Sequence, residues 1–243
     1  MPGLNNFQED TYEDRFQSSF KGFLDRFITE TVPKNKNIIF ALILFIIGGI
    51  YWSSTNGASN DAKIQTQRDE LGKALILGDQ GKLKEQAAAF DIFLAKSGNN
   101  EIIQAKASLY RANLHYSEAE YDKALDMYSQ VLILSGNQPI LSSAAELGAA
   151  STQIQLKKYE VAKTALKAFI VKYSQRSEDP AIRLRANAKD DIIPTVPSAM
   201  WKLALVQKEL GDITAAKELC AKIINVYGDS NESKQAARLV ETL

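Results

Sequence analysis

The sequence has few of the residues that most often build metal and redox sites. It contains one cysteine, Cys220, and one histidine, His115, among 243 residues. A single cysteine excludes an intrachain disulfide, and it leaves the redox compartment open. One cysteine and one histidine cannot supply the ligands of a Cys/His zinc cluster within one chain. We therefore expect no metal site.

An excess of charge and the common catalytic motifs are also missing. Lysine plus arginine number 29 and aspartate plus glutamate number 29, so the formal net charge is zero. Such a chain has no basic footprint for nucleic acid. It contains no Walker loop, no Rossmann glycine fingerprint and no nucleophile elbow. We expect no nucleic-acid partner, no cofactor, no catalytic residues and no enzymatic activity.

Long apolar runs are rare as well, apart from one. Residues 38–52, IIFALILFIIGGIYW, carry no charge and no proline. Fifteen residues make about 22 Å of helix, which is less than the ~30 Å hydrocarbon core of a bilayer. The length that can span a bilayer is increased by flanking residues, Lys34 and Lys36 before the run and the Tyr51–Trp52 pair at its end. The pattern predicts one transmembrane helix over 37–54.

Two alternatives for this run are less consistent with its surroundings. A cleaved signal peptide has a shorter leader than the one in front of Ile38. A buried core helix normally has a polar side, and this run has none. The two nearest charges, Lys34 and Lys36, both precede it. By the positive-inside rule the N-terminus is then cytoplasmic and the large C-terminal part lies across the membrane.

The N-terminal arm, residues 1–36, has a pattern of its own. Between about residues 12 and 32, apolar side chains recur at helical spacing on one stripe, and Pro33 ends the segment. A lone helix cannot bury this stripe on itself, so it needs a membrane surface, a partner or the folded domain. The stripe consists of Phe16, Phe20, Phe23, Leu24, Phe27 and Ile28.

After a polar stretch at 55–61, predicted to be a linker, the chain contains an internal repeat over 62–243. Four segments align on anchor positions separated by 38, 38 and 54 residues. Large apolar residues or cysteine follow each anchor by four and seven positions, and an alanine precedes it by twelve. These spacings predict helix pairs that approach closely at small residues. The anchors are Gln86, Ala124, Ala162 and Ala216.

This pattern resembles the tetratricopeptide repeat. The resemblance is carried by W-K-L-A at 201–204, E-L-G-D-I-T-A-A at 209–216 and Y-D-K-A at 121–124. It implies an all-α chain in which a solenoid of about four helix pairs follows the transmembrane helix. A capping helix covers the C-terminal end at 230–243. The longer last step predicts an insertion at about 176–197, and its role stays open.

The order of arm, membrane helix and repeat domain resembles the ancillary subunit of the bacterial Sec translocon. This implies a single-pass inner-membrane protein with a periplasmic repeat domain that handles exported proteins. Its partners would be translocon subunits or exported chains. The alternatives are a structural scaffold of another envelope complex, with other protein partners, and a hydrolase with a site in the insertion. Oligomeric state stays open.

Repeat domains of this kind bind peptides or proteins on a concave face lined by the first helix of each pair. Counting from the anchors places nine residues on that face: Leu109, Asn113, Tyr116, Leu147, Ser151, Ile154, Trp201, Leu205 and Lys208. Because Leu109 stands where carboxylate-clamping repeats have lysine, we expect apolar segments as ligands. We expect His115 and Cys220 to be packing residues, and Asp190 and Asp191 to be solvated loop charges.

Overall fold

The structure, a computed structural model, describes residues 21, 36–96 and 98–243. It divides into two compact units, Met1–Lys63 and Ile64–Leu243. The side chains of residues 36–45 and 47–58 lie outside the described part. The six residues of the predicted arm stripe lie outside it too.

The first described element is α3 (Lys36–Asp79). The sequence predicts a linker at 55–61, whereas the structure continues the helix through these residues. Serine, asparagine and glycine weaken a helix by up to about 1 kcal/mol each, whereas proline would break it. Residues 55–61 contain no proline. Within the described residues, no helix is both long and apolar enough to cross a membrane.

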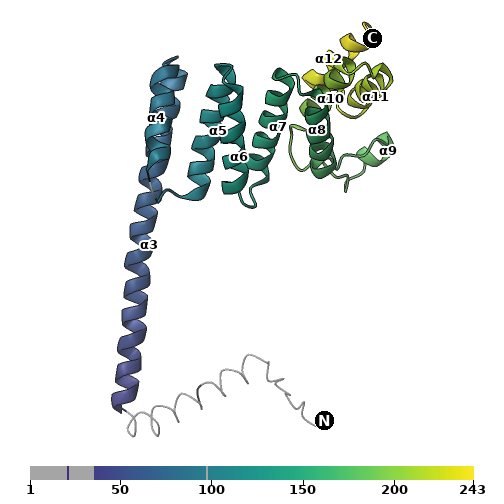
Figure 1. The fold of residues 1–243 in the computed structure, drawn as a ribbon. Coiled ribbons are helices and arrows are strands. Elements are labelled where there is room, and N and C mark those ends of the chain that lie inside the picture. Colours follow the sequence, from purple (N-terminus) through teal and green to yellow (C-terminus); the bar gives the residue numbers. More distant parts are fainter. Residues whose placement is uncertain (1–20, 22–35, 97) are drawn as a thin grey trace, which may run out of the picture. The chain divides into compact units, whose positions relative to one another are not determined.

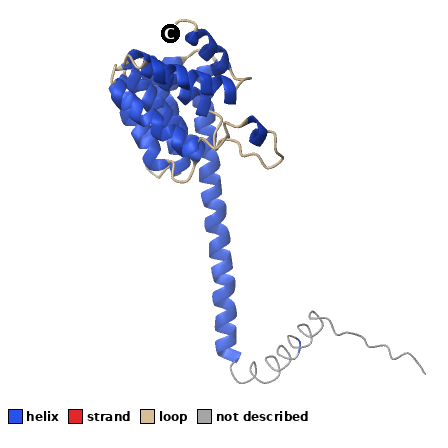
Figure 2. Ribbon diagram, turned by 90° about the vertical axis from the view of Figure 1, so that its right-hand side faces the viewer, coloured by secondary structure: helices blue, strands red, loops and turns tan. Residues whose placement is uncertain are grey.

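The second unit is a row of antiparallel helix pairs joined by loops (Figures 1 and 2). Each pair packs on the next, and α12 packs on α11 and α10. The pairs are the end of α3 with α4 (Leu83–Ala95), α5 (Glu101–Ser117) with α6 (Tyr121–Leu134), α7 (Pro139–Gln155) with α8 (Tyr159–Tyr173), and α10 (Val196–Glu209) with α11 (Ile213–Val226). The short α9 (Pro180–Arg183) lies in the insertion, and α12 (Asn231–Val240) follows α11.

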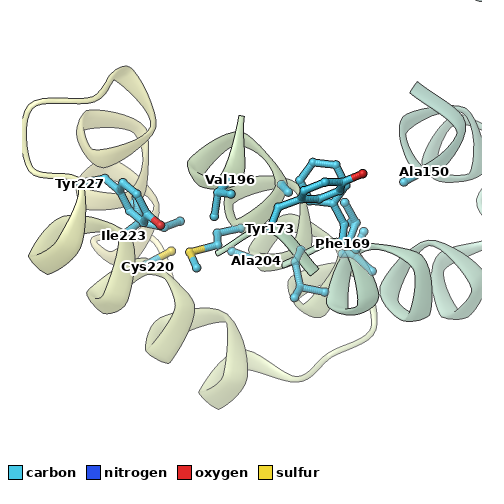
Figure 3. Close-up of a cluster of buried hydrophobic side chains, with 14 of the residues drawn as sticks. Ala150, Phe169, Tyr173, Val196, Ala204, Cys220, Ile223 and Tyr227 are labelled. Atoms are coloured by element: carbon cyan, nitrogen blue, oxygen red, sulfur yellow. The ribbon is translucent and has the colours of Figure 1, made fainter. Parts of the chain in front are cut away.

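The repeat positions read from the sequence form the core of this row. The four anchors, the four alanines twelve residues before them, and the residues four and seven after them are all buried. The last two pairs share one cluster that includes Ala150, Phe169, Ala204 and Cys220 (Figure 3). The predicted helical solenoid is confirmed. The prediction was possible because helical spacing decides which side of each helix meets its neighbour.

Two departures from the repeat pattern are compensated by neighbours. Gln86 stands at a small anchor position, and its amide lies against Gly78, where a Cβ would overlap it. Arg111 stands where an apolar residue is usual, and its side chain is only 11% exposed. Its guanidinium binds Asp91 of α4 through two hydrogen bonds of 2.7 and 3.2 Å. A bidentate pair of this kind is among the stronger side-chain contacts.

The loop between the two helices of each pair has one residue with positive φ, five positions before the anchor. These residues are Gly81 (φ 74°), Ala119 (φ 61°), Lys157 (φ 57°) and Gly211 (φ 81°). Left-handed backbone costs a residue with a Cβ about 1–2 kcal/mol, and it costs glycine almost nothing. The second and third pairs therefore carry strain that the first and fourth avoid.

Replacing Lys157 with glycine should raise the free energy of unfolding by about 0.5–1 kcal/mol, because relief of the left-handed strain exceeds glycine's extra chain entropy. Urea melts followed by circular dichroism measure this change. Gly211→Ala is the matched opposite change and should lower stability. A Lys157→Gly variant that is less stable than wild type would contradict this account of the loop.

Candidate binding surface

The nine residues predicted for the concave face lie on α5, α7 and α10, the first helices of their pairs. Most are half-buried, and Asn113 and Lys208 are exposed. Leu147, Ile154, Trp201 and Leu205 all pack on the same core cluster, and Leu109 and Tyr116 pack on another. The structure thus places the apolar members on α7 and α10 over one shared core cluster.

Two polar contacts organise the α5 end of this face. The Tyr128 hydroxyl donates a 2.7 Å hydrogen bond to Oδ1 of Asn113. The Gln155 amide donates to the Tyr116 hydroxyl over 3.2 Å. Burial raises the pKa of Tyr128 to about 12, so this hydroxyl keeps its proton at neutral pH. Asn113 is therefore already bonded to α6, and Leu109 offers no cation beside it, so no carboxylate clamp is assembled here.

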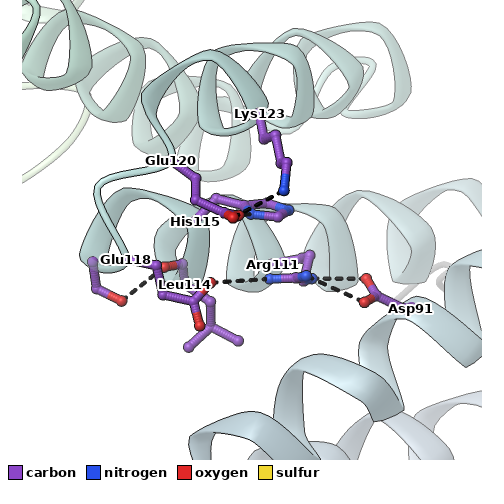
Figure 4. Close-up of polar contacts among 8 residues, drawn as sticks. Asp91, Arg111, Leu114, His115, Glu118, Glu120 and Lys123 are labelled. Atoms are coloured by element: carbon purple, nitrogen blue, oxygen red, sulfur yellow. Dashed lines mark hydrogen bonds and ion pairs between the residues drawn. The ribbon is translucent and has the colours of Figure 1, made fainter.

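His115 belongs to a polar cluster at the turn between α5 and α6 (Figure 4). Its Nδ1 lies 2.6 Å from Oε2 of Glu120, and the histidine is 5% exposed. Ligand atoms of His115, Glu118 and Glu120 lie within 4.8 Å of one another, a spacing that suits a metal ion. However, Lys123 Nζ lies 2.9 Å from Glu120 Oε1, and Arg111 faces Glu118. The cluster's carboxylates are thus neutralised by protein cations.

Cys220 lies buried on α11 within the core cluster of the last two pairs (Figure 3). Burial raises the pKa of its thiol. A protonated, enclosed thiol is a poor nucleophile and a poor metal ligand. The cysteine therefore acts as a small apolar packing residue.

The insertion forms a pocket of about 450 Å³ with the end of α11 and the loop that follows it. Asp190 and Asp191 both line it, but their roles differ. Asp190 is 82% exposed and pairs with Arg176 at 2.8 Å. Asp191 Oδ1 accepts from the backbone N–H of Gln175 and Arg176, and its Oδ2 accepts from the Tyr227 hydroxyl over 2.7 Å. The prediction of two solvated charges describes Asp190 only.

Sequence reasoning missed a second surface feature, an apolar groove that we call the α7–α8 groove. Its volume is about 340 Å³. The apolar residues lining it come from three helices, α6, α7 and α8, and alanine is the most frequent residue among them. The full lining is Leu132, Glu146, Ala149, Ala150, Gln153, Val161, Ala165, Ala168, Phe169 and Lys172. The signal for it in the sequence was Val161, an apolar residue outside the repeat's core positions at the start of α8. Only the packing of three helices shows that a groove lies beside this valine.

Comparison with known proteins addresses the fold. The family model described as tetratricopeptide repeat matches residues 198–230, which cover most of α10 and all of α11. A tetratricopeptide repeat protein from Parabacteroides merdae superposes with a TM-score of 0.54 at 16% identity, over 73% of this chain and 59% of that one. The domain has the tetratricopeptide-repeat fold.

A second tetratricopeptide-like structure supports the same conclusion. It is a Podosopora anserina protein described as a kinesin light chain with nearly identical repeats, with a TM-score of 0.52 and 14% identity. The superposition covers 71% of this chain and 82% of that one. No curated protein matches the sequence significantly. At these identities the likeness concerns the fold alone, and tetratricopeptide domains with this fold are typically scaffolds for protein interactions.

Proposed function

We propose that this chain is a membrane-anchored adaptor that binds other proteins through its repeat domain. One observation carries the binding part: half-exposed apolar side chains of α7 and α10, including Leu147 and Trp201, lie over one shared core cluster. Large aromatic and aliphatic side chains that are held rigidly from behind, with one edge free, are typical anchors of protein interfaces. Lys208 and Asn113 are exposed and give this face a polar margin.

Photo-cross-linking tests the proposed face in cells. A photoreactive amino acid at Leu205 should give discrete adducts with other proteins. The same residue at Leu184, which is 88% exposed in the insertion, is the matched control and should give few. Replacing both Trp201 and Tyr116 with alanine should reduce the Leu205 adducts at least about tenfold, because truncated interface anchors often cost more than 1.4 kcal/mol. Equal adduct yields at Leu205 and Leu184 would contradict a specific face.

The membrane part of the proposal is supported by the charge-free run at 38–52, which lies within α3. Protease added to intact spheroplasts should digest residues 62–243, and protease added only from the cytoplasmic side should leave them whole. Extraction of the chain by carbonate without detergent would contradict membrane anchoring. Digestion of 62–243 only from the cytoplasmic side would reverse the proposed orientation and remove the basis for a periplasmic role.

The proposed setting is the Sec translocon of a bacterial inner membrane, where the adaptor would contact exported chains. The support is the order of arm, apolar run and repeat domain, which resembles the translocon's ancillary subunit. Purification in mild detergent should recover translocon subunits with the chain. A stable complex with other envelope proteins and without translocon subunits would instead identify a scaffold subunit of that complex.

A further inference from the structure

The α7–α8 groove lies on a different side of α7 from the predicted concave face. At about 100° of rotation per residue, Ala149 and Gln153 share one side of α7, while Leu147, Ser151 and Ile154 share another. On α8 the groove residues Val161, Ala165, Ala168 and Lys172 follow helical spacing along one stripe. The groove is therefore an independent surface of the same repeat.

The charge in the groove is balanced within it. Glu146 and Lys172 are the charged residues among its described lining. Lys172 Nζ lies 2.7 Å from Glu146 Oε1 and 4.8 Å from the centre of the Tyr173 ring. A ligand that brought a charge would have to break this pair or stay unpaired beside alanine and valine, and both are costly. The groove thus favours an uncharged ligand.

One polar atom in the groove lacks a partner. Oε1 of Gln153 is buried and accepts no hydrogen bond from the residues that the structure describes. A buried acceptor without a donor costs about 1–3 kcal/mol. A side-chain hydroxyl or amide on a ligand would satisfy it, because rotation of the glutamine's χ angles can turn the amide toward the groove.

The shape of the groove suits a helix. Its stripe on α8 runs from Val161 to Lys172, about 16 Å or three helical turns. Ala149, Ala150, Ala165 and Ala168 line it, and small lining residues let another helix backbone approach closely. Leu132 and Val161, 40% and 54% exposed, add larger apolar side chains to its lining.

We propose that the α7–α8 groove binds an uncharged apolar helix of a partner protein, about three turns long, that donates a hydrogen bond to Gln153. The inference rests on the proposed adaptor function and adds to it a second surface and the chemistry of the ligand. A segment of this type has no charged side chains, and its apolar face is exposed until it is bound.

A defined peptide tests this inference with the full chain held in amphipol, and with amphipol alone as the blank. The probe is a fluorescein-labelled helical peptide of about 14 residues, with blocked termini, leucine along one face and one serine among them. Fluorescence anisotropy should show saturable binding to the wild type. Ala165→Glu should weaken binding at least about tenfold, a change of 1.4 kcal/mol. Val171→Glu, 84% exposed on the same helix, should bind like the wild type.

A second variant tests the hydrogen bond. Gln153→Leu should lose affinity for the serine peptide but not for a matched peptide with alanine in its place, so that the two effects couple in a double-mutant cycle. Circular dichroism melts show whether each variant is folded. Equal affinity of wild type and Ala165→Glu, or no saturable binding by the wild type, would overturn the inference.

The remaining outcomes also separate this inference from the proposed function. Wild-type self-association that Ala165→Glu abolishes would make a second copy the occupant and overturn the assignment to a partner helix. If the wild-type chain does not bind the peptide but still gives adducts from Leu205, the groove inference is overturned and the adaptor function stands. If the wild-type chain gives neither peptide binding nor Leu205 adducts, the adaptor function itself is overturned.

Discussion

Replacing Asp191 with alanine is expected to lower the free energy of unfolding of the repeat domain by about 3 kcal/mol. The carboxylate accepts hydrogen bonds from the backbone N–H groups of Gln175 and Arg176, at 2.8 and 3.0 Å, and from the Tyr227 hydroxyl at 2.7 Å. Tyr227 is 6% exposed, so its hydroxyl would lose its partner in a site that water reaches poorly. The pKa of Tyr227 is raised, mainly by burial and secondly by the hydrogen bond to Asp191.

Asp191 joins parts of the domain that are distant in sequence. Gln175 and Arg176 follow the end of α8, and Tyr227 follows the end of α11. The side chain therefore holds the insertion against the last two helix pairs at once. Its loss should loosen the insertion as well as lower stability, and hydrogen exchange at residues 176–195 should become faster.

Asp190→Ala is the matched control for this prediction. Asp190 is 82% exposed, and its partner among the described residues is Arg176. Exposed ion pairs contribute about 0–1 kcal/mol, so this variant should melt close to wild type. Asp191→Asn should fall between the two, because its amide oxygen still accepts from the backbone. Equal effects of the two alanine variants in urea melts would show that Asp191 is not a structural anchor.

Replacing Gly148 with alanine is expected to destabilise the domain by about 1–3 kcal/mol. Glycine to alanine inside a helix normally stabilises by about 0.5–1 kcal/mol. Here a Cβ at position 148 would overlap the ring of Tyr128 on the neighbouring α6. That ring is 2% exposed and is held by its bond to Asn113, so it has little room to move. The clash should therefore reverse the usual sign.

Gly72→Ala measures the normal effect within the same chain. Gly72 lies in α3, where a Cβ meets no described atom within 4 Å, and this variant should gain about 0.5–1 kcal/mol. Gly148→Ala combined with Tyr128→Leu should recover part of the lost stability. Thermal melts that show both glycine variants stabilised would contradict close packing between α6 and α7.

The sequence alone was sufficient to predict the helix pairs and the residues that form their core. Ala112, Ala150 and Ala204 are buried at the predicted spacing, as are Phe90 and Leu166 in the second helices. This succeeds because the side of a helix that a residue occupies depends on spacing along the chain, and a repeat tests the same spacing four times. The prediction of a linker at 55–61 was wrong, because polar residues of low helix propensity remain helical there.

Only the tertiary structure decided what individual polar and small residues do. Asp190 and Asp191 are adjacent and chemically identical, yet one faces solvent and the other ties the insertion to the segments that follow α8 and α11. Gly148 is one helical glycine among others until the Tyr128 ring of another repeat covers it. The α7–α8 groove likewise needs three helices, α6, α7 and α8, to exist. Helical periodicity is a local property of the chain, whereas these environments are created by residues many positions apart, and their distances follow only from how the pairs and the insertion pack.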